Sequence, residues 1–127
     1  MWIFTRWGFY SIACADKPGT TEIDPDTVMV RARVKKHLTN LLQQFPSFGD
    51  TKILALPGRD YEFRLIVPKA VWVEVLKELA EEQTWANFKS EAAARKADTG
   101  TAYVNKLHAV WWEMLQLQEP GTKRDWS

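Results

Sequence analysis

Residues 28–45 read VMVRARVKKHLTNLLQQF, and the spacing of the apolar residues changes within this stretch. It begins with an alternation of period two, which predicts a strand whose buried face consists of Val28, Val30, Ala32 and Val34. It continues with spacings of three and four, which predict an amphipathic helix with the apolar stripe Val34, Leu38, Leu41, Leu42 and Phe45. We therefore expect a strand that leads directly into a helix, and the helix should end near Pro46 and Gly49.

The flanking segments extend this pattern to a complete fold. Residues 2–13 are rich in aromatic and β-branched residues and predict strand structure, with Gly8 at a bulge, a bend or a tight turn. The composition of residues 16–26 predicts a surface loop. Two strands joined at Pro57-Gly58 are expected at 52–56 and 61–67. Helices are expected at 68–80, within 91–97, and in the last segment before Pro120.

This order of elements predicts an α+β fold. We expect a mostly antiparallel sheet of about four or five strands with two helices packed on one face, which is a rearranged ferredoxin-like plait. The last helix is expected either across the other face of the sheet or beside the first two helices. Its position matters, because a helix across the second face would bury the side chains that emerge there.

Length and composition predict one domain. The chain has 127 residues, is 46% hydrophobic and carries a formal net charge of +1, which excludes bulk disorder. We predict a single domain over 1–121 and a polar tail at 122–127. Cys14 is the one cysteine, which excludes a disulfide framework. With no signal-like N-terminus and no apolar run of roughly 18–20 residues, a cytoplasmic protein without membrane contact is expected.

Charge is distributed unevenly along the chain. Residues 27–49 contain no acidic residue, whereas residues 74–82 contain four glutamates and one lysine. If the strand alternation holds, Arg31, Arg33 and Arg64 project together from the sheet face opposite the helices. Guanidinium groups recognise phosphates and carboxylates. The candidate residues for binding nucleic acid or a small anionic ligand are therefore Arg31, Arg33, Lys35, Lys36 and Arg64.

The seven tryptophans are the second unusual feature. Core packing accounts for most of them, but Trp and Arg also dominate the energetic centres of protein interfaces. The leading hypothesis is a non-enzymatic module that binds a protein partner or itself through an aromatic surface and complementary charge. The candidate interface residues are Trp2, Trp7, Tyr10 and Trp112.

Two other functions stay open at this point. The arginine face could bind nucleic acid, although the isoelectric point of about 7.8 is low for that class and the arginines could equally be solvated strand residues paired with Glu62 or with the last helix. A small enzyme acting on an anionic substrate would use His37 or Tyr10 as its proton carrier. The sequence shows no spacing of His and Cys suited to a metal and no phosphate-binding loop, so no metal and no cofactor are expected.

The sequence contains several short motifs: Trp2-x-Phe4-Thr5, Gly8-Phe9-Tyr10-Ser11, Val30-Arg31-Ala32-Arg33, Asp60-Tyr61-x-Phe63-Arg64 and Asn87-Phe88-Lys89. Together they resemble those of a small bacterial and phage family without an assigned function. The resemblance covers most of the chain and implies a compact, stand-alone cytoplasmic protein, and it carries over no catalytic residue.

Overall fold

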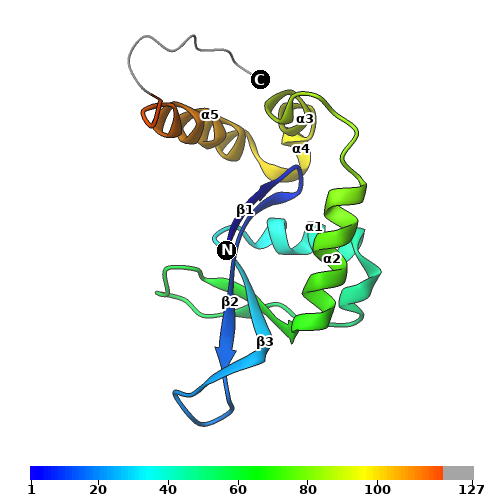
Figure 1. The fold of residues 1–127 in the computed structure, drawn as a ribbon, viewed down its shortest axis with the longest axis vertical. Helices are drawn as coiled ribbons and strands as arrows, with labels where there is room; N and C mark the ends of the chain where they lie inside the picture. Colours follow the sequence, from blue (N-terminus) through cyan, green and yellow to red (C-terminus); the bar gives the residue numbers. More distant parts are fainter. Residues whose placement is uncertain (119–127) are drawn as a thin grey trace.

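A computed structural model describes residues 1–118, which form a five-stranded sheet and two groups of helices (Figure 1). The strands are β1 (Trp2–Thr5), β2 (Gly8–Asp16), β3 (Ile23–Ala32), β4 (Leu54–Ala55) and β5 (Phe63–Pro68). They lie in the order β1-β2-β3-β5-β4, and every neighbouring pair is antiparallel. The predicted α+β class is confirmed. The predicted domain boundary at 121 and the predicted tail at 122–127 lie outside the described residues.

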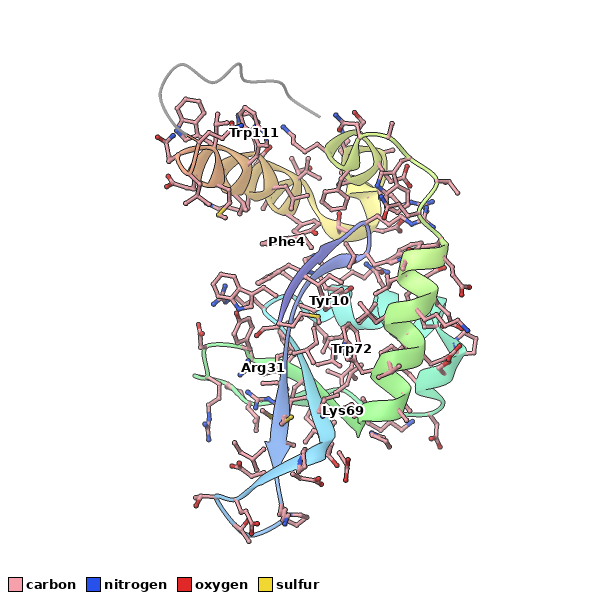
Figure 2. All side chains as sticks on the ribbon, in the orientation of Figure 1. Phe4, Tyr10, Arg31, Lys69, Trp72 and Trp111 are labelled. Carbon is pink, nitrogen blue, oxygen red and sulfur yellow. The ribbon has the colours of Figure 1, made fainter. Side chains whose placement is uncertain are left out.

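The helices form two groups. The first group contains α1 (Lys35–Gln44), a short 3-10 helix (Pro46–Phe48) and α2 (Lys69–Glu81), and the second contains α3 (Phe88–Ala94), α4 (Lys96–Thr99) and α5 (Thr101–Leu115). The first group packs on one face of the sheet, where Tyr10 and Trp72 lie between the sheet and the helices (Figure 2). The predicted two-helix layer is therefore confirmed.

The strand alternation of β3 builds this core. Val28, Val30 and Ala32 are buried, as predicted. Each fully buried valine or leucine side chain stabilises the fold by about 1.5–3 kcal/mol, so this face holds the layers together. Val34 differs from the prediction, because it is the N-cap residue of α1 and is 43% exposed.

Other boundaries also differ from the prediction. The expected loop at 16–26 was wrong in its second half, because β3 begins at Ile23 and pairs with the end of β2. The pairing is irregular there, with a register shift between Cys14 and Ala15, and such a bulge accommodates Pro25, which has no N–H to donate. The expected strand at 52–56 is reduced to β4, and the expected helix at 91–97 is divided into α3 and α4.

The second group of helices packs against the β1–β2 hairpin. Tyr103 and Leu107 of α5 and Ala92 of α3 form a small apolar cluster with Phe4 and Phe9 of the hairpin. The Tyr103 hydroxyl donates to the Thr5 carbonyl oxygen at 2.7 Å. The second group therefore lies at the hairpin end of the sheet, and Arg31 lies farther along the sheet, away from α5 (Figure 2).

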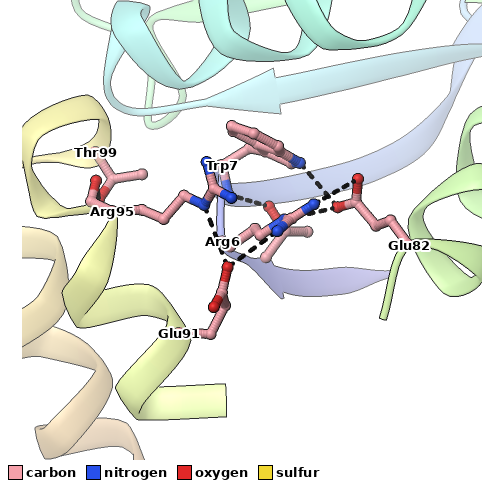
Figure 3. Close-up of polar contacts among 7 residues, drawn as sticks. Arg6, Trp7, Glu82, Glu91, Arg95 and Thr99 are labelled. Carbon is pink, nitrogen blue, oxygen red and sulfur yellow. Dashed lines mark hydrogen bonds and ion pairs between the residues drawn. The ribbon is translucent and has the colours of Figure 1, made fainter. Parts of the chain in front are cut away.

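Ion pairs hold the hairpin turn between the two groups of helices (Figure 3). Arg6 lies in the turn between β1 and β2, with Nη1 2.9 Å from Glu91 of α3 and Nη2 3.2 Å from Glu82 at the end of α2. Trp7 Nε1 donates to the same Glu82 carboxylate at 2.9 Å, and Arg95 Nε lies 3.2 Å from Glu91. We call this network, made of Arg6, Trp7, Glu82, Glu91 and Arg95, the Arg6 clasp.

Candidate functional site

The sheet face opposite α1 and α2 carries a continuous row of side chains from all five strands. Residues directly opposite each other in antiparallel strands project from the same face. Arg31 lies opposite both Ser11 and Arg64, Ser11 lies opposite Trp2, and Arg64 lies opposite Leu54. The row is therefore Trp2, Ser11, Arg31, Arg64 and Leu54. The expectation that Arg31 and Arg64 project together is confirmed by this register.

Arg33 joins the same face through an aromatic ring. The guanidinium carbons of Arg33 and Arg31 lie 4.3 and 4.8 Å from the centroid of the Tyr61 ring. Arg33 also pairs with Asp60 at 3.0 Å. Tyr61 lies in the expected strand at 61–67 but precedes β5, so the strand alternation does not fix its orientation. Its ring lies beneath the two arginines.

Arg64 is held mainly by neutral groups. Its Nη2 donates to the Tyr61 carbonyl oxygen at 3.0 Å, and its Nη1 donates to the Met29 sulfur at 3.4 Å. Its Nε is buried and has no hydrogen-bond partner among the described residues. Burial, and then the like charges of Arg31 and Arg59, hold the pKa of Arg64 below its usual range. Within residues 1–118 no ion pair is shown for Arg31, Arg59 or Arg64, so their positive charges are not neutralised by a carboxylate there.

Arg31 is oriented by β2. Its Nη2 donates to the Ser11 hydroxyl at 2.8 Å, and its Nε donates weakly to the Ser11 carbonyl oxygen at 3.4 Å. The sequence left open that Glu62 or the last helix neutralises the arginines. The hydrogen-bond acceptors shown for Arg31 and Arg64 are instead a hydroxyl, carbonyl oxygens and a sulfur.

Beside the arginines, a groove of about 650 Å³ is lined by residues of both the hairpin and α5. Trp2, Phe4 and Phe9 form its wall on the sheet side, where the Phe4 and Phe9 rings stack with centroids 4.6 Å apart. The α5 side presents one helical face, with residues spaced by four positions. These α5 residues are Ala102, Lys106 and Val110.

Two cations are among the residues that line this mostly apolar groove. Arg33 lies at the end of the groove where β3 meets α1, and Lys106 lies on the α5 wall. Both side chains are exposed. Trp2 is 71% exposed, which is unusual for the largest apolar side chain. The groove can therefore take apolar groups on its walls and negative charge at its edge.

The predicted interface tryptophans and tyrosine fall into two classes. Trp2 and Trp112 are exposed, at 71% and 50%. The prediction that Trp7 and Tyr10 lie at an interface is wrong, because they are only 5% and 0% exposed. Tyr10 shares the helix-facing side of β2 with Ile12, and the Trp7 ring is covered by Arg6 and Arg95 at 4.9 and 4.8 Å.

The predicted basic residues also separate in space. Arg31, Arg33 and Arg64 share the open sheet face, whereas Lys35 and Lys36 are exposed on the first turn of α1 and do not belong to the row. Sequence reasoning missed Arg59 and Lys106. Arg59 follows the Pro57-Gly58 turn and could have been found from its place between two paired strands, but no local pattern connects Lys106 with the sheet.

The two proposed proton carriers are engaged with the backbone. The Tyr10 hydroxyl donates to the His37 carbonyl oxygen at 2.7 Å. His37 Nδ1 accepts from the Phe9 N–H at 3.3 Å, and its Nε2 lies 2.9 Å from the Thr99 carbonyl oxygen. Burial lowers the pKa of His37 and raises that of Tyr10. These contacts fit structural roles for both residues.

Comparisons with protein-family models, curated proteins and solved structures found no match. Among residues 1–118, no group of three or more His, Cys, Asp or Glu side chains is placed to hold a metal ion. No helix in that range is long and apolar enough to cross a bilayer. The groove and the arginine row are therefore the features on which a functional proposal rests.

Proposed function

We propose that this protein is a non-enzymatic binding module that takes an acidic segment of a protein partner into the groove between the hairpin and α5. The observation that carries the proposal is an aromatic wall that ends in the exposed Trp2, beside two exposed cations that line the groove. These cations are Lys106, for which no ion pair is shown within residues 1–118, and Arg33, whose pair with Asp60 is exposed to solvent. We further propose that the module works in the cytoplasm, because its single cysteine has no intrachain partner with which to form a disulfide.

The size of the groove supports a short segment as its occupant. Its volume of about 650 Å³ is that of a pocket for a small ligand or a few side chains, and it is too small to seat a folded domain. Phe4 and Phe9 are fixed by stacking and by the apolar cluster with α5, so little entropy is lost when a ligand packs on them. Trp2 meets Phe9 edge to face, with centroids 6.0 Å apart, and forms the exposed end of this wall.

The positive charge of the surface around the groove favours an acidic segment as its occupant. Arg33 and Lys106 border the groove, and Arg31 and Arg64 extend the positive surface along the adjacent row. An acidic segment would be attracted by this positive surface and held in the groove by Lys106 and Arg33, whereas a basic segment would be repelled. A second copy of the chain could offer its glutamate-rich α2, so self-association is an outcome that the test must separate.

Fluorescence anisotropy with a labelled peptide tests this proposal. The probe is a peptide of roughly ten residues in which Glu alternates with Leu and Phe, and matched probes carry Gln or Lys in place of Glu. We expect binding of the Glu peptide alone, weakened at least about tenfold by Trp2→Ala and by Lys106→Glu. The controls are Trp112→Ala, which removes an exposed tryptophan outside the groove, and Lys77→Glu on α2.

The same experiment can overturn the proposal. Absence of binding of the Glu peptide up to about 1 mM, or equal binding of the Lys peptide, would contradict it. The proposal would also be contradicted if Trp2→Ala and Trp112→Ala reduced the affinity for the Glu peptide equally. Light scattering of the free protein tests self-association. A dimer that dissociates with salt and competes with the peptide would assign the groove to a second copy of the chain.

Single-stranded nucleic acid is the second candidate, favoured by the common face of Arg31, Arg33 and Arg64. One observation weighs against this candidate. The Tyr61 ring lies beneath Arg31 and Arg33, and Tyr61 is only 6% exposed. Bases therefore cannot stack on this ring without displacing the two arginines. Binding would fall steeply with salt and would be weakened by Arg31→Ala together with Arg33→Ala in a folded protein. No retention of an oligonucleotide at low salt would rule this candidate out.

A further inference from the structure

The arginines of the described chain differ in whether a carboxylate neutralises them. Arg6, Arg33 and Arg95 each form an ion pair with an aspartate or a glutamate. No ion pair is shown within residues 1–118 for the other three, which are Arg31, Arg59 and Arg64. We call these three residues the arginine trio.

The members of the trio are neighbours in space. Arg31 and Arg64 are direct cross-strand partners on β3 and β5, and like charges in that position repel each other. Arg59 lies in the β4–β5 connection, five residues before Arg64 in the chain, and its like charge, after burial and that of Arg31, lowers the pKa of Arg64. Three positive charges are thus gathered at one place, although the chain has nearly as many acidic residues as basic ones.

Arg64 is also partly withdrawn from water. Its Nε is buried without a partner, and the hydrogen bonds from its two terminal nitrogens go to the Tyr61 carbonyl oxygen and the Met29 sulfur. A desolvated guanidinium interacts more strongly with an anion than a solvated one does. Each terminal nitrogen carries two hydrogens, so each retains one for a ligand.

We propose that Arg31, Arg59 and Arg64 form a binding site for a compact, doubly charged oxyanion, and that the chemical class of the ligand is a phosphate monoester. Guanidinium groups match the geometry of phosphate oxygens, and each such bond is charge-assisted. A dianion relieves the repulsion among three cations more fully than a carboxylate or a phosphodiester, which carries one charge. Ser11, which holds Arg31 in place, is a positioning residue for this site.

This site is distinct from the groove of the proposed function. None of its three arginines lines the groove. Phosphate binding can therefore be disproved while peptide binding is confirmed, and peptide binding can be disproved while phosphate binding is confirmed. A phosphorylated side chain and a free phosphorylated metabolite present the same group. Their shared chemistry is the monoester dianion, and the test includes both sources.

Isothermal titration calorimetry at a fixed ionic strength and about pH 7.5 tests the proposal. The probes are inorganic phosphate, O-phosphoserine, a short phosphoserine peptide, acetate, and an oligonucleotide without a terminal phosphate. We expect binding of the phosphate probes in preference to acetate, and at least about tenfold weaker binding in Arg64→Gln. Tighter binding of the peptide than of O-phosphoserine would identify a protein side chain as the source, and the opposite order would identify a metabolite.

Two further variants keep the test decisive if Arg64→Gln fails to fold. Arg59 is exposed, so Arg59→Gln leaves the core intact and is expected to weaken phosphate binding about threefold. Lys36→Gln removes an exposed cation of α1 outside the trio and should leave the affinity unchanged. Equal affinity in wild type and Arg59→Gln, acetate binding as tightly as phosphate, or preference for the oligonucleotide would each overturn the proposal.

Discussion

His37 Nε2 lies 2.9 Å from the carbonyl oxygen of Thr99, and this contact connects α1 to the second group of helices. A carbonyl oxygen accepts only, so the Nε2 atom carries the proton, and Nδ1 is left to accept from the Phe9 N–H. Asn40, one turn later, donates to the carbonyl oxygens of Trp7 and Asp98. The neutral imidazole is therefore part of the junction between α1, the hairpin and α4.

The first prediction is a loss of stability in mild acid. Burial lowers the pKa of folded His37 below the unfolded value of about 6.5, so the unfolded chain binds a proton that the folded chain does not. The contribution to stability is complete above about pH 6.5 and is lost as the pH falls towards the folded pKa, by at most about 1.4 kcal/mol per pH unit. Urea denaturation between about pH 7.5 and pH 4.5 measures it.

A histidine variant isolates this effect from the carboxylates that titrate at lower pH. His37→Gln cannot titrate and should lose most of the slope just below about pH 6.5, with lower stability at neutral pH. The difference in slope between the wild type and His37→Gln measures the contribution of His37. An unchanged slope in His37→Gln would show that another group is responsible.

The second prediction concerns alkaline conditions. The Tyr103 hydroxyl donates to the Thr5 carbonyl oxygen, and burial raises the pKa of Tyr103 above its usual value of about 10. The unfolded chain then releases a proton that the folded chain keeps, so stability is complete below about pH 10 and falls as the pH rises above it. Tyr103→Phe should show a shallower loss of stability between about pH 9 and pH 11.5 than the wild type, measured by urea denaturation.

The local parts of the fold are the parts that the sequence predicts well. The change of period within residues 28–45 predicts β3 and α1, because both elements expose one face and bury the other. The same alternation predicts that Arg31 and Arg64 share a face. The strand structure of residues 23–27 was not predicted. These residues pair with the end of β2 through backbone hydrogen bonds and a bulge, and they have no alternating apolar pattern.

The groove was not predictable from local patterns. Its walls combine Trp2 and Phe9 with Lys106 and Val110, which are about 100 positions away in the chain. The contacts that place α5 there are the apolar cluster of Tyr103 and Leu107 with Phe4 and Phe9, and the hydrogen bond from Tyr103 to Thr5. Interactions at such separations leave no periodic signal. For the same reason Trp7 was assigned to a surface, although its indole N–H is satisfied by Glu82.

The third prediction concerns Gly8, at the start of β2. Its φ of +145° disfavours any other residue, and a Cβ atom there would lie 2.3 Å from Cγ of His37, well inside contact distance. Gly8→Ala should therefore destabilise the fold by at least about 3 kcal/mol, since strain adds to a clash with a buried ring. Gly58→Ala is the matched control: its φ is +85° but its Cβ would meet open space, so a loss of about 1–2 kcal/mol is expected from urea denaturation.

The fourth prediction concerns the Arg6 clasp. The Arg6 side chain is 15% exposed and pairs with carboxylates that are 20% and 22% exposed, so Arg6→Ala leaves the partly buried Glu82 without its ion pair and leaves Glu91 with Arg95 alone. The exposed pair between Lys17 and Glu22 provides the control. We expect the loss of stability in Arg6→Ala to be at least about threefold larger than in Lys17→Ala, with faster amide exchange in α3. Equal losses would show that the clasp is no more than a surface ion pair.

The fifth prediction is an unfavourable coupling between Arg31 and Arg64. Because Arg31 and Arg64 are direct cross-strand partners on β3 and β5, replacing one of them removes the repulsion between their charges, and replacing the second then removes nothing further. A double-mutant cycle with Arg31→Gln and Arg64→Gln should therefore give a repulsive coupling of about 0.2–1 kcal/mol at low salt, reduced at about 0.5 M salt. If the arginine trio binds a phosphate ion, inorganic phosphate should abolish this coupling, whereas chloride at the same concentration should not. An attractive or absent coupling at low salt would mean that the two charges are separated in solution, and the argument for an anion between them would fail.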